Sequence, residues 1–169
     1  MKGPVILRPL ERRDADVIAR WAADPEFCRA ADWTVGLPFD QCRAFHRDLI
    51  DSPPADLLRL GAVHDAELVG YVDLHGDEPG RRELGFVIGE RSRWGRGLGR
   101  SAAGAGLDHG FDRLGLREVW AEALDANRRS VRILQSLGFT ETGKGADSMF
   151  LGRPTSYRQF TITAGDRTR

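Results

Sequence analysis

The chain has 169 residues, of which 41% are hydrophobic and 30% are charged, and its formal net charge is +0. This length suits one globular domain, which we expect to span residues 1–169 with a frayed tail from about residue 164. The neutral balance removes the electrostatic argument for a nucleic-acid partner or a polybasic membrane anchor, and no apolar run approaches the roughly 20 residues of a membrane span. We therefore expect a cytoplasmic protein without nucleic-acid or membrane partners.

The first third of the chain predicts helices after one short strand. Residues 4–8 form an apolar strand, Asp14 is a plausible N-cap for the helix that follows, and Asp24-Pro25 ends that helix. A second helix fits residues 39–50, where apolar side chains recur on one face. Residues 27–37 between the two helices are predicted to be irregular.

From residue 57 the hydrophobic period changes from 3.6 to 2, which predicts β-strands. The apolar or small residues at alternating positions are Leu58, Leu60 and Ala62, then Leu68, Gly70, Val72 and Leu74, then Leu84, Phe86 and Ile88. The connections between these runs are too short for parallel crossovers, so the three strands form an antiparallel meander.

The most informative segment follows that meander. Residues 94–99 read Trp-Gly-Arg-Gly-Leu-Gly and lead into a run with helical periodicity. Alternating glycines permit positive φ and a close backbone approach, and the start of the helix offers unpaired N–H groups. Arg91, Arg93, Arg96 and Arg100 flank the turn. The pattern predicts a phosphate cradle, and a diphosphate-bearing ligand is the natural candidate.

The rest of the chain alternates helix and strand. The helix after the glycine turn stops at Gly115, and residues 118–124 read as the next strand. Asn127 is a predicted N-cap for a helix that ends at Gly138, and a strand at residues 155–163 closes the sheet.

Two other phosphate-binding motifs compete for the glycine turn. Gly97-x-Gly99-x-x-Ala102 satisfies the dinucleotide fingerprint, with Glu122 about 20 residues further on. That fingerprint requires a parallel sheet, whereas an antiparallel meander precedes it here. A P-loop is excluded because no Gly-Lys-Ser/Thr follows the glycines.

At this point the chain resembles a known family, the GCN5-related N-acetyltransferases (GNAT). Their acetyl-CoA loop has the form Arg/Gln-x-x-Gly-x-Gly/Ala, and residues 94–99 occupy its place with Trp as the first residue. That replacement resembles the branch that contains the ribosomal-protein N-terminal-alanine acetyltransferases. Three further pieces agree with the branch: Leu7-Arg8-Pro9-Leu10 with Asp14 and Asp16, Glu83-Leu84-Gly85-Phe86-Val87-Ile88, and Asn127-x-x-Ser130 ending in Leu137-Gly138-Phe139.

The resemblance implies an α/β fold with a mixed, centrally splayed sheet flanked by about four helices. It also implies acetyl-CoA as acyl donor, no metal, and direct attack of an amine on the thioester. The glycine turn would hold the pyrophosphate through its backbone, and the edge of the preceding strand and an asparagine would contact the pantetheine arm. The residues assigned to acetyl-CoA are Phe86, Val87, Ile88, Trp94, Gly95, Arg96, Gly97, Leu98, Gly99, Arg100 and Asn127.

Catalysis needs a neutral amine and a group that assists the leaving thiolate. Glu83 is the first choice as general base, because it lies near the splay and burial can raise its pKa; Asp73 and His75 on the neighbouring strand are alternatives. In many relatives a tyrosine protonates the thiolate, and Leu134 stands at the equivalent position. Ser130 resembles the hydroxyl that serves in the N-terminal-acetylating branch, although a plain helix-start residue is an open alternative.

We place the acceptor near Trp33, together with Asp73 and His75, because the early helices cover the open side of the splay in this fold. Packing alone is an equally open role for Trp33. Cys28 and Cys42 lack metal-ligand spacing, so we expect free thiols and no metal.

The expected activity is acetyl transfer to a primary amine, a protein N-terminus by the branch resemblance. A small amine, polyamine or antibiotic-like acceptor is the competing enzyme hypothesis. A non-catalytic acyl-CoA-binding regulatory module is also open, because Leu134 replaces the tyrosine. The sequence leaves the choice between monomer and homodimer open.

Overall fold

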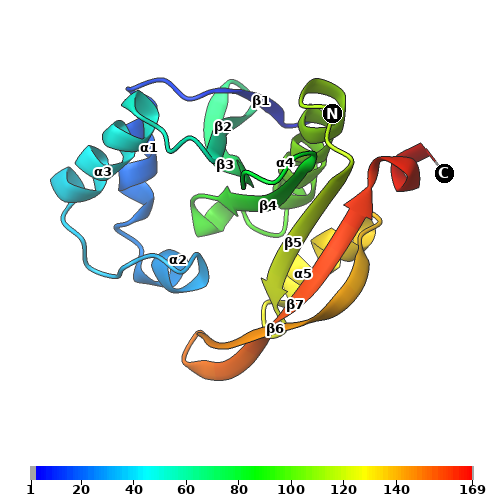
Figure 1. Ribbon diagram of the computed structural model, residues 1–169. Helices are drawn as coiled ribbons and strands as arrows, with labels where there is room; N and C mark the ends of the chain where they lie inside the picture. Colours follow the sequence, from blue (N-terminus) through cyan, green and yellow to red (C-terminus); the bar gives the residue numbers. More distant parts are fainter. Residues whose placement is uncertain (1–2, 169) are drawn as a thin grey trace.

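The computed structural model describes residues 3–168, which form a seven-stranded mixed sheet with helices on both faces (Figure 1). The strands are β1 (Ile6–Pro9), β2 (Leu57–His64), β3 (Glu67–His75), β4 (Arg81–Ile88), β5 (Glu118–Leu124), β6 (Thr140–Phe150) and β7 (Arg153–Thr163). The α-helices are α1 (Asp14–Trp21), α2 (Pro25–Ala30), α3 (Phe39–Asp51), α4 (Leu98–Asp108) and α5 (Arg128–Ser136). Short 3₁₀ or π turns lie at Arg91–Arg93, His109–Arg113 and Ala164–Thr168.

The sheet order is β1-β2-β3-β4-β5-β7-β6, and its centre is splayed. The strands β2, β3 and β4 form the predicted antiparallel meander, and β1 extends it by pairing antiparallel with β2. β4 and β5 run parallel but pair only where Arg81, Arg82 and Glu83 face residues 118–120. Beyond Glu83 the two strands separate, which confirms the splayed α/β architecture.

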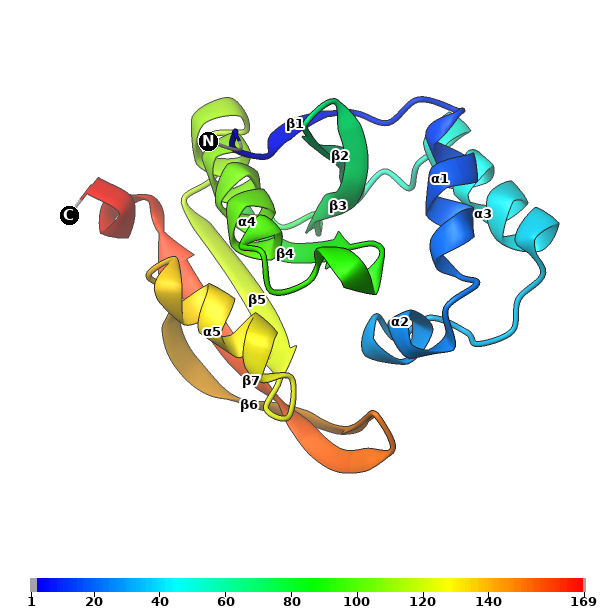
Figure 2. The same cartoon turned by 180° about the vertical axis from the view of Figure 1, so that it is seen from behind.

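The two faces of the sheet are covered differently. α4 and α5 pack on one face, where the main core contains Val72 and Leu84 of the meander, Leu107 of α4, Val119 of β5 and Leu134 of α5 (Figure 2). α1, α2 and α3 gather on the other face beside β2 to β4, over a second apolar cluster. The face of β5 and β7 turned toward the viewer in Figure 1 carries none of the five described α-helices.

The beginning of the chain differs from the sequence prediction in two places. Asp14 is not an N-cap but the buried first residue of α1, where its carboxylate accepts hydrogen bonds from Arg8 at 2.7 and 3.0 Å. Asp24 does not end a helix but caps α2, because its Oδ1 accepts the Glu26 N–H at 3.0 Å. Pro25 at the first helical position starts α2 in part of the segment that was predicted to be irregular.

The end of the chain also differs. β6 was not predicted, and it forms the edge of the sheet by pairing with β7 in a long hairpin. Ala164–Thr168, expected to be frayed, forms a 3₁₀ turn, and Arg169 lies outside the described residues. No helix within residues 3–168 is long and apolar enough to cross a membrane.

Candidate functional site

The glycine turn leads from β4 into α4 and exposes backbone donors. Gly95 and Gly97 have φ of +73° and +81°, and no atom lies within 4 Å of a Cβ built on either, so the conformation alone requires glycine there. Gly97 is the N-cap of α4, and its carbonyl accepts the Ser101 N–H at 3.0 Å. The preceding N–H groups of Leu98, Gly99 and Arg100 therefore have no acceptor within the helix and form an anion-binding end.

Trp94 fastens the turn to the end of β4. Its indole Nε1–H donates to the Ile88 carbonyl at 2.8 Å. The Gly89 N–H donates to the Val69 carbonyl of β3. Successive residues of a strand point their N–H and C=O groups to alternate sides, so those of Val87 face β3 and those of Phe86 and Ile88 face the splay. Among the three strand residues assigned to the pantetheine, Val87 therefore turns its backbone toward β3, although Val87 also lines the cavity described below.

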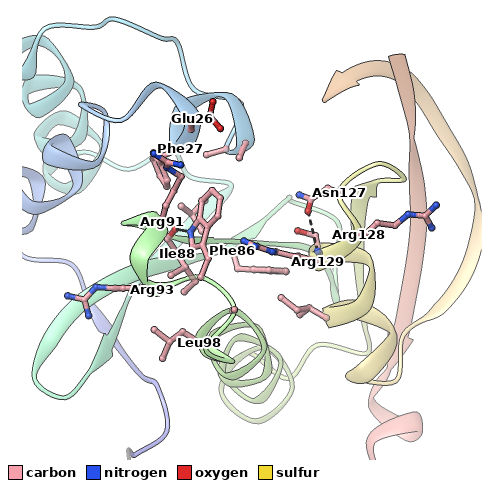
Figure 3. A pocket seen from close by; sticks show the side chains of 18 of the residues that line it. Glu26, Phe27, Phe86, Ile88, Arg91, Arg93, Leu98, Asn127, Arg128 and Arg129 are labelled. Atoms are coloured by element: carbon pink, nitrogen blue, oxygen red, sulfur yellow. Dashed lines mark hydrogen bonds between the residues drawn. The ribbon is translucent and has the colours of Figure 1, made fainter. Parts of the chain in front are cut away.

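A cavity of about 630 Å³ joins the glycine turn to the splay (Figure 3). Nine sequence-predicted residues line it: Phe86, Val87, Ile88, Trp94, Gly95, Leu98, Gly99, Asn127 and Ser130. Seven other predicted residues do not line it: Glu83, Arg96, Gly97, Arg100, Trp33, Asp73 and His75. Eight of the eleven residues predicted for acetyl-CoA thus line the cavity, whereas none of the three predicted for the acceptor does.

The arginines around the cavity differ in whether they have partners. Arg91 pairs with Asp24, and Arg93 pairs with Glu67 at 2.7 Å, so both are neutralised on the surface. Arg128 and Arg129 have no acidic partner within residues 3–168. Arg129 reaches across the cavity toward Phe86, with its guanidinium carbon 5.4 Å from the centre of the Trp94 ring, whereas Arg128 points the other way (Figure 3).

The start of α5 contributes the remaining polar groups of the cavity. The Asn127 Oδ1 accepts the Ser130 N–H at 3.3 Å, which confirms Asn127 as the predicted N-cap. This bond leaves the Asn127 amide N–H₂ and the Ser130 hydroxyl for other partners. Leu134, one turn further along, is buried in the main core and supplies no proton.

Glu83 lies on the opposite side of the sheet from α4. Its neighbour Leu84 is buried in the core beneath α4, so strand alternation directs Glu83 to the other face. Burial, and then the negative charge of Glu122, raise the pKa of Glu83 above its usual range. The His75 Nδ1 lies 4.0 Å from the Glu83 carboxylate.

Asp73 and His75 are both engaged by other side chains. Arg59 holds Asp73 in a bidentate pair, with bonds of 2.7 and 2.8 Å, and its guanidinium also lies 3.9 Å from the centre of the Tyr71 ring. The His75 Nε2 lies 3.1 Å from the Asp56 carboxylate. By contrast, His75 is the only basic side chain within 4.0 Å of the Glu83 carboxylate in residues 3–168.

Trp33 belongs mainly to the packing beneath α1, α2 and α3. Its ring meets the Phe27 ring edge-on, with centroids 5.0 Å apart, and lies 5.2 Å from the His46 ring. His46 is buried, and burial followed by the charge of Arg59 lowers its pKa to about 4. His46 is thus neutral at pH 7 and belongs to the same packing beneath α1, α2 and α3.

Sequence reasoning missed several residues that line the cavity: Glu26 and Ala30 of α2, Ala31 directly after it, Arg128 and Arg129 of α5, and Phe150 and Leu151 of the β6–β7 hairpin. The Asp24-Pro25 pair carried a readable signal for α2, because Asp at the N-cap and Pro at the first helical position start helices. No comparable local signal marks Phe150 and Leu151. Within residues 3–168 no group of three His, Cys, Asp or Glu side chains is arranged to hold a metal ion, and both cysteines are buried free thiols.

A family profile described as "Acetyltransferase (GNAT) domain" matches residues 5–140, most of the chain. The chain belongs to the GNAT acetyltransferase family. Among curated relatives, the uncharacterised N-acetyltransferase p20 of Bacillus licheniformis is 30% identical over 142 residues, which are 81% of this chain and 79% of that protein. The putative ribosomal N-acetyltransferase YdaF of Bacillus subtilis is 30% identical over 101 residues, 57% of this chain and 55% of that one.

Solved structures of GNAT proteins share the fold. The spermidine N-acetyltransferase of Vibrio cholerae, in complex with CoA and spermine, superposes with a TM-score of 0.82 at 20% identity, over 98% of this chain and 99% of that chain. RimJ of Mycobacterium smegmatis, in complex with CoA-disulfide, superposes with a TM-score of 0.78 at 22% identity, over 99% and 89%. The family membership and the named relatives make this GNAT chain an N-acetyltransferase, and the family uses acetyl-CoA.

The residues present fit the phosphate-bearing donor of that family. The free N–H groups at the start of α4 suit a pyrophosphate, and Arg129 brings an unpaired positive charge over the same cavity. The peptide groups of Phe86 turned toward the splay suit the amides of a pantetheine arm.

Proposed function

We propose that this GNAT chain transfers an acetyl group from acetyl-CoA to a primary amine, and that the acceptor is a protein N-terminal amine. The observation that carries the proposal is the cavity that joins the glycine turn to the splay, with Glu83 on the far side of the same opening. Such an arrangement lets a donor and an acceptor meet from opposite faces of the sheet.

Acetyl-CoA, when bound, supplies an activated thioester carbonyl. In this proposal the N–H groups of residues 98–100 hold its pyrophosphate, with Trp94 keeping the turn against β4. The peptide groups of Phe86 and the N–H of Ile88 face the pantetheine, and the Asn127 amide is the side-chain partner. A strand N–H at the splay polarises the carbonyl.

Glu83 and Ser130 divide the proton transfers between them. The Glu83 carboxylate accepts a proton from the acceptor nitrogen, and its raised pKa brings it closer to the pH at which the enzyme works. The Ser130 hydroxyl, which lines the cavity, donates a proton toward the departing sulfur and takes up a proton from solvent in return. A thiol with a pKa of about 8.5 leaves readily, so this second role needs less assistance than the first.

Two observations support an N-terminal amine as acceptor. A putative ribosomal N-acetyltransferase is among the relatives. In addition, the face of β5 and β7 lies open beside α2 and the β6–β7 hairpin, and Met149 and Leu151 expose apolar side chains on that hairpin. An extended peptide needs such an open surface.

A small polycationic amine is the second candidate acceptor. Glu83 and Glu122 place negative charge at the splay, which suits any ammonium group. A spermidine N-acetyltransferase also shares the fold.

The experiment is calorimetric titration with CoA, followed by thiol release from acetyl-CoA with alanine- and serine-starting peptides, spermidine and an aminoglycoside. The proposal predicts CoA binding and turnover with peptides in preference to the small amines. Turnover with small amines alone would move the assignment to the second candidate. Binding without turnover on any acceptor would support a regulatory module and contradict the proposal.

A further inference from the structure

Glu122 faces the same side of the sheet as Glu83. Val119, Ala121 and Ala123 of β5 are buried in the core beneath α4 and α5, so the residues between them point to the opposite face. Glu122 is one of these, so it points to the face of β5 that none of the five described α-helices covers (Figure 1).

The two carboxylates lie where the central strands separate. Glu83 stands opposite Trp120 in the last parallel pair between β4 and β5, and Glu122 follows two residues later on the same face. The charge of Glu122 acts on the Glu83 carboxyl, and the charges of Asp32, Glu122 and Glu83 all act on the Tyr157 hydroxyl from β7. The acidic groups therefore converge on one place beside the splay.

Within residues 3–168 this place lacks the arginines that neutralise other acids of the same face, and the His75 ring, with Nδ1 4.0 Å from Glu83, is the one group beside it that can carry a positive charge. Asp73 is paired with Arg59, and Glu118 at the start of β5 is paired with Arg81. No Arg or Lys within residues 3–168 pairs with Glu83 or Glu122. The Gln159 Nε2 donates to the Glu122 Oε1 at 2.9 Å, which fixes the carboxylate without neutralising its charge.

A glycine keeps the approach to Glu122 open. A Cβ built on Gly145 of β6 would lie 3.4 Å from the Glu122 Oε1, 3.3 Å from the Gln159 Nε2 and 3.0 Å from the Tyr157 Cβ. Any side chain at Gly145 would therefore crowd the group that holds the Glu122 carboxylate.

We propose that Glu83 and Glu122 together form the subsite that binds the positively charged amine of the acceptor, and that this subsite disfavours acceptors with an acidic group beside the reacting amine. The proposal rests on the proposed transfer to an amine. The ammonium donates charge-assisted hydrogen bonds to both carboxylates. It then gives one proton to Glu83, which becomes a carboxylic acid and later passes that proton to solvent, while Glu122 keeps its charge and the nitrogen gains its lone pair.

The test is steady-state kinetics of Glu122→Gln with an alanine-starting peptide, at saturating acetyl-CoA. We expect the KM for the peptide to rise about tenfold with kcat nearly unchanged, because a charge-assisted bond to the substrate is lost. Since Glu122 helps to raise the pKa of Glu83, the acidic limb of the pH profile also moves to lower pH. Discrimination against a peptide with Asp at its second position weakens. Glu118→Gln, which removes the same charge from the same strand, serves as the matched control.

A second variant separates the subsite from a loss of folding. Gly145→Ala keeps every charge but crowds Glu122, so it also raises the KM for the peptide while CoA affinity stays the same. An unchanged KM in Glu122→Gln, with the wild-type chain active, would overturn the subsite and leave the proposed function standing. Failure of the wild-type chain to acetylate any amine would overturn both.

Discussion

The α4 side of the splayed sheet offers backbone N–H groups and Arg129, which has no acidic partner within residues 3–168, whereas the opposite side offers Glu83 and Glu122, of which Glu122 is held by the Gln159 amide. The first side is built for a ligand that carries phosphate, and the second for a ligand that carries an amine. Residues of α2 and of the β6–β7 hairpin also line the cavity on the α4 side, so the two sides of the sheet meet at the splay.

The difference explains how one family fold can keep its donor and change its acceptor. Backbone donors at residues 98–100 depend on two glycine conformations and very little on other side chains. The acceptor side depends on side chains from β4, β5 and β7, each of which one substitution can replace. We infer that acceptor choice is the more easily altered property of this chain.

The largest expected effect comes from removing the base on the acceptor side. Glu83→Gln should lower kcat about 100-fold, because general-base catalysis contributes at least about this much. CoA affinity, measured by calorimetry, should stay within about twofold, because Glu83 does not line the donor cavity. Full activity of this variant would remove Glu83 from catalysis and break the division between the two sides.

The pH dependence of the wild-type enzyme sharpens the same division. Glu83 acts as a base only when ionised, and its pKa is raised, so kcat/KM should fall as the pH drops toward that raised value. This acidic limb should disappear in Glu83→Gln, while the pH dependence of CoA binding stays as in the wild type. If the acidic limb of the kcat/KM profile persists in Glu83→Gln, a group other than Glu83 causes it.

A change in the backbone of the glycine turn should weaken CoA binding about tenfold. Gly97→Ala places a Cβ at φ +81°, a strain of about 1–2 kcal/mol that reorients the free N–H groups of α4. Gly115→Ala, at φ +64° and equally free of contacts, carries the same strain outside the site and is the matched control. Calorimetry should show weaker CoA binding only in Gly97→Ala, although thermal stability falls in both variants. Equal CoA affinities in the two would contradict the cradle.

A smaller effect should separate two adjacent arginines. Arg129→Ala should weaken CoA binding about fivefold, because an exposed charge contact is worth about 1 kcal/mol. Arg128 also lines the cavity, but its side chain extends away from Phe86 and Arg129, so Arg128→Ala should change the affinity much less (Figure 3). Titrations at low and high salt should show the difference shrinking as salt screens the contact. Equal losses of CoA affinity in the two variants would mean that only the net charge of α5 affects binding.

The donor side was largely predictable because its signal is contiguous. Residues 94–99 showed the glycine turn and its place before a helix, and Asn127 showed the start of the next helix. Arg129 was missed, because a charged residue early in a helix is ordinarily solvent-exposed and nothing local shows that it crosses a cavity.

The acceptor side was predicted less well because it is assembled by tertiary structure. Glu122 stood out in the sequence only as the acid of a dinucleotide fingerprint, and its real neighbours, Glu83 and Gln159, are distant along the chain. β6 was missed because its residues are mostly polar and exposed and include two glycines; its pairing with β7 makes it a strand. α2 was missed because Pro25 was taken as a stop when it marks a start.

The most direct test of the central claim is to locate the transferred acetyl group. The wild-type chain is incubated with acetyl-CoA and an alanine-starting peptide that also contains one lysine, and fragmentation mass spectrometry identifies the acetylated nitrogen. We predict acetylation at the N-terminal nitrogen, which has a pKa of about 8 and is more easily deprotonated than a lysine side chain with a pKa of about 10.4. Acetylation confined to the lysine, or no acetylation of the peptide while spermidine is acetylated, would contradict it.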